Sequence, residues 1–202
     1  MFLQSLNEVV VDALGFDPGR IRSIARKLRE AEILPQGGRG LSAAHVEPEH
    51  AFDLVLGYIL SDTLELARVR VREFYSSLRP IDTENTPIGC ENARKTFGAL
   101  IRKQLKEGWI ATDNEVLRSM TKRVELPTGK YVFDILIEYP LNSVEFLFYS
   151  NALGSKLEKT IHFVHDTENH EIRNVRYQYR FQLKQGAFLK IAEAFSAEER
   201  YR

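Results

Sequence analysis

The spacing of apolar residues changes once along this chain, and that change constrains the fold more than any other feature. Up to about residue 107, apolar side chains recur every three or four positions, which is typical of amphipathic helices. From Lys122 onward they alternate with polar side chains, most clearly between Glu171 and Lys184, which is typical of strands with one covered face. Helices followed by strands that short turns connect predict an α+β protein with an antiparallel meander.

A proline-rich stretch divides these two parts. Residues 79–89 hold two prolines and several turn formers, so we expect a domain boundary there. The first domain, residues 1–80, should be a helical module with helices at about 3–14, 18–33, 48–60 and 63–78. The second, residues 81–202, should hold a helix at about 91–107, the meander, and a final helix that follows a turn at Gly186 and covers the sheet.

The best-defined helix begins at Pro18. Asp17 is a good N-cap, and proline suits the first helical position because its missing N–H costs nothing there. Leu34 and Pro35 should stop the helix. Apolar residues at helical spacing form one stripe that we expect to be buried: Ile21, Ile24, Ala25 and Leu28.

Basic residues of the same helix gather beside that stripe. Arg22, Arg26 and Arg29 fall within about 60° of one another around the helix axis, so they should form one cationic ridge. Arg20 and Lys27 flank the other side of the stripe. Residues 36–40, with sequence QGGRG, can turn tightly because glycine accepts positive φ, and they carry Arg39. A helix of this kind suits the DNA major groove, and the loop could reach the backbone or minor groove.

The segment IRSIARKLREAEILP followed by QGGRG resembles a winged helix-turn-helix module, with the helix as recognition helix and the loop as wing tip. It is also similar to the N-terminal region of uncharacterised bacteriophage and prophage proteins. The resemblance covers about the first third of the chain. It implies a partner, double-stranded DNA, that we expect the following residues to contact: Arg20, Arg22, Arg26, Lys27, Arg29 and Arg39.

The charge of the chain limits how DNA could be bound. There are 28 basic and 28 acidic residues, so the whole protein generates no net cationic field. Binding must therefore depend on local asymmetry, and residues 18–45 provide it, with six Lys and Arg residues against two acidic ones.

Within DNA binding, the sequence leaves the biological role open. We expect a phage- or prophage-type transcriptional regulator that acts as a homodimer, in which the helix at 63–78 could pair two copies. A DNA-recognition subunit of a phage packaging or recombination machine is the alternative. A third reading is a non-enzymatic adaptor that does not bind DNA and whose sheet edge or acidic helix docks a protein partner; the C-terminal domain could hold such a partner.

Other chemistry finds little support in the sequence. Phosphate-binding loops, hydrolase elbows and zinc motifs do not occur, so we expect no enzymatic activity, cofactor or metal. His162 and His165 lie an odd number apart on an expected strand and should face opposite ways, which argues against a metal site. The basic row Arg176, Arg180 and Lys184 should lie on the face opposite the tyrosines, which argues against base stacking.

The single cysteine, Cys90, cannot form an intrachain disulfide and fits a reducing cytoplasm. The first residues read as an amphipathic helix and not as a signal peptide, and no run is long enough to span a membrane. We therefore expect a cytoplasmic protein.

Overall fold

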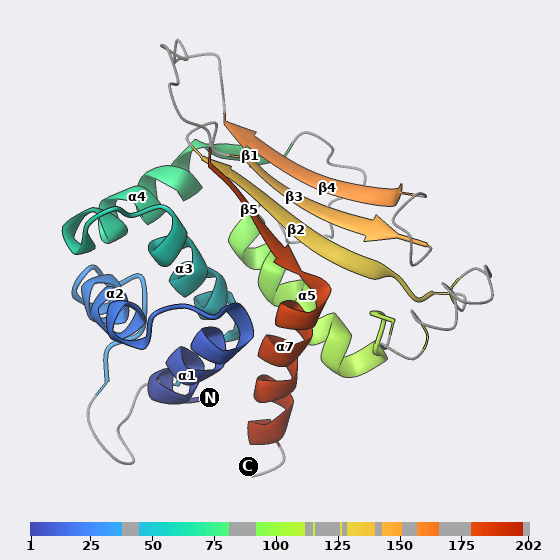
Figure 1. The fold of residues 1–202 in the computed structure, drawn as a ribbon, viewed down its shortest axis with the longest axis horizontal. Helices are drawn as coiled ribbons and strands as arrows, with labels where there is room; N and C mark the ends of the chain where they lie inside the picture. Colours follow the sequence, from blue (N-terminus) through green and yellow to red (C-terminus); the bar gives the residue numbers. More distant parts are fainter. Residues whose placement is uncertain are drawn as a thin grey trace. The chain divides into compact units, whose positions relative to one another are not determined.

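The computed structural model describes residues 1–37, 45–80, 92–111, 115, 126, 129–139, 143–150, 157–165 and 179–199. It confirms the α+β class, with helices and one five-stranded antiparallel sheet (Figure 1). The chain divides into two compact units, one formed by residues 1–76 and 186–202 and the other by residues 77–185. The first division falls close to the expected linker. Residues 186–202, which we expected to cover the sheet, group with the N-terminal helices.

The helical unit contains five helices among the described residues: α1 (Leu3–Leu14), α2 (Pro18–Glu30), α3 (Pro48–Ile59), α4 (Leu64–Ser77) and α7 (Gln185–Glu199). Their starts at residues 3, 18 and 48 match the sequence-based expectation. Two boundaries do not. Helix α2 ends at Glu30, before Leu34 and Pro35, and α7 begins at Gln185, so Gly186 lies inside the helix and makes no turn.

Apolar side chains from α1, α2 and α3 form the core of this unit. Leu6, Ile21, Ile24, Leu28 and Phe52 are all fully buried. Helices α2 and α3 cross at Gly57, where an added Cβ would lie 2.8 Å from Ile24 Cγ2. Glycine is therefore needed at this crossing because a side chain would push the two helices apart.

The N-terminus pairs with the chain that follows the glycine-rich loop. Phe2 and His45 form an isolated antiparallel bridge, and the Val46 N–H donates to the Met1 carbonyl at 2.8 Å. The loop after Gly37 thus starts near the C-terminal end of α2 and returns beside the start of α1. Gly38–Gly40, including the expected wing tip at Arg39, lie outside the described residues.

The second unit is built on the sheet, in the order β1-β4-β3-β2-β5. Its strands are β1 (Leu78–Pro80), β2 (Val132–Tyr139), β3 (Ser143–Tyr149), β4 (Leu157–His165) and β5 (Tyr179–Lys184). Neighbouring strands are antiparallel throughout, but only β2, β3 and β4 follow one another as a meander. Strand β5 pairs with β2 instead of β4, and β1, at residues where we expected a helix end and a linker, pairs with β4. The expectation of a simple meander was therefore wrong for the two outer strands. Of the long strand expected at 171–184, residues 171–178 lie outside the described part, as do residues 122–125 and 127–128, where the alternating pattern begins.

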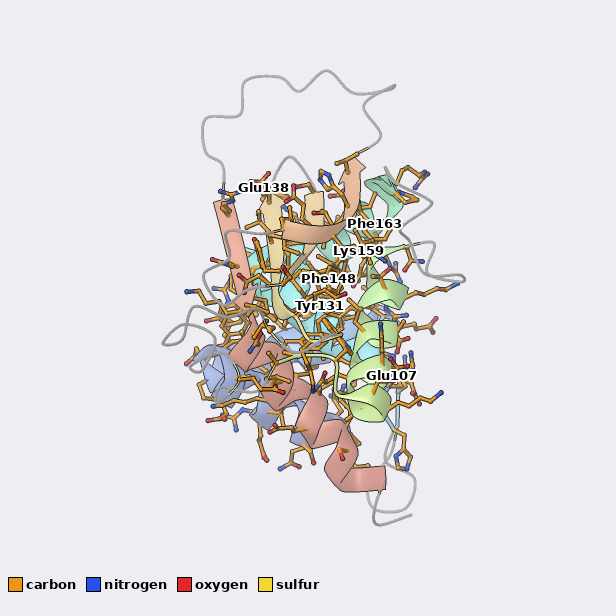
Figure 2. All side chains as sticks on the ribbon, turned by 90° about the vertical axis from the view of Figure 1, so that its right-hand side faces the viewer. Glu107, Tyr131, Glu138, Phe148, Lys159 and Phe163 are labelled. Atoms are coloured by element: carbon orange, nitrogen blue, oxygen red, sulfur yellow. The ribbon has the colours of Figure 1, made fainter. Side chains whose placement is uncertain are left out.

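One face of the sheet is apolar. Phe133 pairs with Phe148, Ile135 with Phe146, and all four side chains are buried; Figure 2 marks Phe148 and Phe163 on the sheet. Helix α5 (Ala93–Glu107) is N-capped by Asn92 and leads to Trp109, whose ring meets Phe133 edge-on at 5.0 Å. The other face is polar, with Asp134, Glu138 and Arg180 pointing away from this core.

Candidate nucleic-acid interface

Helix α2 has the local structure that its sequence predicts. The Asp17 carboxylate accepts a 2.6 Å hydrogen bond from the Arg20 N–H, and Pro18 occupies the first turn. The expected stripe is buried in full: Ile21, Ile24, Ala25 and Leu28. The buried stripe fixes how α2 is rotated, and so decides which basic residues can meet a ligand.

Arg20 turns toward its own protein. Its guanidinium donates to the Ser61 carbonyl oxygen and lies 5.0 Å from the centre of the Tyr58 ring. Tyr58 in turn stacks on Phe16 at 3.8 Å and accepts a hydrogen bond from the Asp17 N–H. A cation over an aromatic ring with a carbonyl acceptor is a favourable, partly desolvated arrangement. Arg20 therefore ties the start of α2 to the end of α3.

Lys27 is also bound within the protein. Its ammonium lies 2.5 Å from a Glu65 carboxylate oxygen on α4 and 3.3 Å from Glu30, and only 16% of the side chain is exposed. Hydrogen bonding to Glu65 and Glu30 raises the pKa of Lys27, and the same bond to Lys27 lowers the pKa of Glu65. Two carboxylates already neutralise the charge of Lys27, so this side chain attracts a polyanion only weakly.

Arg22 and Arg26 remain open to solvent on the other side of the stripe. Arg22 is exposed and makes no hydrogen bond or ion pair within the described part of the chain; it borders a groove between α1 and α2 that Glu8 also lines. Arg26 is 62% exposed, and its one ion pair among the described residues is with Glu30, at 3.7 Å. Exposed pairs at this distance contribute little, so Arg26 can exchange Glu30 for another anion at small cost.

Arg29, the third residue of the ridge, is half-buried. Its Nε lies out of contact with solvent and has no hydrogen-bond partner among the described residues. Together with Arg26, Glu30, Gln36 and Gly37, it lines a hollow at the C-terminal end of α2. The sequence predicted the arginines of this hollow but not the contribution of Gln36 and Gly37, because the early end of α2 brings them back beside the helix.

That early end has a specific cause. Glu32 adopts a left-handed conformation with φ 58°, and the chain then closes a Schellman motif. The Ile33 N–H donates to the Leu28 carbonyl and the Glu32 N–H to the Arg29 carbonyl, both at 2.9 Å. From α4, Arg72 donates to the Ala31 carbonyl. Non-glycine residues seldom take this conformation, so the propensity of Glu32 gave no signal of it.

The six residues expected to contact DNA therefore separate into three groups. Arg22, Arg26 and Arg29 lie together on one side of α2, as predicted. Arg20 and Lys27 are engaged with neighbouring helices. Arg39 lies outside the described residues.

The polar face of the sheet holds Arg180 and His162, two of the other residues that the sequence singled out. Arg180 pairs with Glu138 at 3.2 Å, and Arg176 lies outside the described residues. His162 approaches Glu145 at 3.3 Å. No group of three potential metal ligands occurs within the residues that could be searched. Asp134 accepts a bond from Gln182, while its partial burial raises its pKa.

Neither protein-family models, nor curated proteins, nor solved structures gave a match to this chain. Among the helices that the structure describes, none combines the length and apolar character needed to cross a membrane.

Proposed function

We propose that this protein binds duplex DNA through the side of α2 that carries Arg22, Arg26 and Arg29. The observation that supports the proposal is the division of charge on this helix. One side is sealed by its apolar stripe, while Arg22 and Arg26 project into solvent without a strong internal partner. Arginine suits such a surface because its planar fork can bind a phosphate, or the O6 and N7 atoms of guanine, with two hydrogen bonds.

The proposed roles differ along the helix. Arg22 and Arg26 contact base edges and phosphates in the major groove, Arg29 contacts the backbone, and Arg39 reaches flanking DNA from the loop. Arg20 and Lys27, which the sequence placed in the same interface, instead hold α2 in position through Tyr58 and Glu65. The proposed class remains a winged helix-turn-helix module.

The proposed biological role is a phage- or prophage-type transcriptional regulator that acts as a homodimer in the cytoplasm. A DNA-recognition subunit of a packaging or recombination machine would use the same surface but assemble into a larger ring. Light scattering of the purified protein separates these roles, since a regulator is expected at the mass of two chains. A monomer with no affinity for DNA would instead favour the protein-binding adaptor.

Arg22→Ala combined with Arg26→Ala tests the interface. We expect the double variant to bind a mixed-sequence duplex about 10- to 100-fold more weakly, as lost arginine contacts typically cost a few kcal/mol. The dependence of affinity on salt should also become shallower, because fewer counterions are released. Fluorescence anisotropy with a labelled duplex measures both quantities.

A matched control removes two charges elsewhere. Lys106 on α5 and Lys184 on β5 are exposed residues of the sheet unit, and their combined replacement by alanine changes net charge equally. We expect that control to bind DNA within about twofold of the wild type, as distant charges are screened. Equal losses in the two double variants would contradict the interface on α2.

A further inference from the structure

The hollow at the C-terminal end of α2 has the donors of an anion site. It is lined by Arg26, Arg29, Glu30, Gln36 and Gly37 and has a volume of about 360 Å³. Sites for small ligands start at about 300 Å³, so a phosphate group fits within it.

Arg29 supplies the strongest indication of a missing partner. Its Nε–H is shielded from water and donates to no acceptor among the described residues. A buried donor left unpaired is costly, and a bond from a charged donor to an anionic oxygen is stronger than a neutral one. Arg26 lies one turn earlier on the helix, and within the described part of the chain its 3.7 Å pair with Glu30 is the one ion pair that it would give up.

A helix C-terminus ordinarily repels anions because its last carbonyl oxygens carry partial negative charge. Here the carbonyl oxygens of residues 28, 29 and 31 already accept hydrogen bonds. The Leu28 carbonyl accepts from Ile33, the Ala31 carbonyl from Arg72, and the Arg29 carbonyl from both Glu32 and the Gln36 side chain. Bonded carbonyls present less negative charge to the hollow, and the two guanidinium groups outweigh what remains.

Among the described residues that line the hollow, Glu30 is the one with an acidic side chain, and it is already paired. Its carboxylate contacts Lys27 at 3.3 Å on one side and Arg26 at 3.7 Å on the other. An entering anion can take Arg26 while Lys27 keeps Glu30, so no carboxylate is left without a cation. Glu30 still repels the anion, and this makes it the residue whose neutralisation should strengthen binding.

We infer that this hollow is the subsite for one phosphodiester of the DNA backbone, held by Arg29 Nε and the guanidinium of Arg26. The inference rests on the proposed DNA binding and adds the place where one phosphate sits. With that phosphate fixed at one end of α2, Arg22 near the other end is left to approach the bases.

Two pairs of variants test the subsite by duplex anisotropy over a range of KCl concentrations. Glu30→Gln should tighten binding about 3- to 10-fold, whereas Glu32→Gln, an equal charge change two residues outside the hollow, should change it less than about twofold. Arg29→Lys keeps the charge but loses the Nε donor, and should weaken binding about 10-fold. Arg68→Lys, at an exposed arginine of α4, should have no such effect. Thermal unfolding of each variant checks that it is folded.

The outcomes separate the two proposals. If the wild-type protein binds the duplex but Glu30→Gln matches Glu32→Gln and Arg29→Lys matches Arg68→Lys, the subsite is wrong and DNA binding stands. If the wild-type protein does not bind the duplex at all, the proposed function fails and takes the phosphate assignment with it.

Discussion

The two sides of α2 both carry basic side chains, but the side chains on each side have different partners. On the side that faces α3 and α4, Arg20 lies over Tyr58 and Lys27 contacts Glu65. On the open side, Arg22 has no internal partner within the described residues and Arg26 has only a weak one. The sequence predicts DNA contact for all four, with Arg22 and Arg26 on one side of the apolar stripe and Arg20 and Lys27 on the other.

What separates the two sides is the surface that each one meets. The Tyr58 ring near the end of α3 and the Ser61 carbonyl just after it lie beside Arg20, and the Glu65 carboxylate in the first turn of α4 lies beside Lys27. Those groups lie some forty residues further along the chain, so no local pattern reveals them. Substitutions on the packed side should therefore cost stability and spare DNA binding, while those on the open side should do the reverse.

The largest stability effect is expected at the crossing of α2 and α3. Gly57→Ala would place a methyl group 2.8 Å from Ile24 and 3.1 Å from Leu28. We expect this substitution to lower the free energy of unfolding by about 2 kcal/mol, although alanine ordinarily stabilises a helix relative to glycine. Urea unfolding followed by circular dichroism measures the change. A stabilised variant would mean that the helices are not in close contact there.

Arg20→Ala should have the next largest effect. It removes the bond to Ser61 and the contact with Tyr58, and we expect a loss of about 1 kcal/mol in stability. Affinity for a DNA duplex, measured on the folded protein, should stay close to that of the wild type. If Arg20→Ala instead weakens DNA binding as much as Arg22→Ala, the division between the two sides of α2 breaks down.

Glu32→Gly should stabilise the protein slightly. The left-handed conformation costs a non-glycine residue about 1 kcal/mol, and glycine avoids this cost. Glycine also makes the unfolded chain more flexible, which offsets part of the gain. We expect a net gain of about 0.5 kcal/mol in urea unfolding. Glu32→Gln, which removes the charge and keeps the strain, is the control and should bring no comparable gain.

The smallest effect concerns pH. The bond from Lys27 lowers the pKa of Glu65 in the folded protein. Above pH 4.5, the ordinary pKa of this carboxyl in the unfolded chain, the ionised carboxylate therefore stabilises the folded state. This stabilisation is lost as the pH falls through the lowered pKa of Glu65 in the folded state. Glu65→Gln should therefore reduce the dependence of melting temperature on pH below 4.5, whereas Glu32→Gln should leave it unchanged. Parallel curves for the two variants would show that the Lys27–Glu65 pair contributes nothing.

Sequence reasoning predicted the parts of the fold that depend on local spacing. The start of α2, its buried stripe and the antiparallel run β2-β3-β4 follow from caps and periodicity, which act over a few residues. The positions of β1 and β5 at the two edges of the sheet were not predicted, because pairing between residues far apart in the chain sets them. The end of α2 was placed too late because Glu32 takes an unfavourable conformation that the closing hydrogen bonds impose. The grouping of α7 with the N-terminal helices depends on contacts between the two ends of the chain, such as that of Lys190 with Asp12 at 2.9 Å.

The candidate interface was predictable to a similar degree. Helical geometry placed Arg22, Arg26 and Arg29 together, because it requires only the residue spacing. The engagement of Arg20 and Lys27 and the hollow formed with Gln36 and Gly37 required the positions of distant residues. In each case residue spacing predicted the side of the helix on which a side chain lies, but not the group that it contacts.

The central claim is that DNA meets the open side of α2, and mapping of backbone amide signals by NMR during titration with a duplex tests it most directly. The account predicts that the largest shifts fall on residues 22, 26 and 29 and on the chain at 36–37, and that they shrink in the Arg22→Ala and Arg26→Ala double variant. Shifts confined to the sheet unit, or spread evenly over the protein, would contradict it.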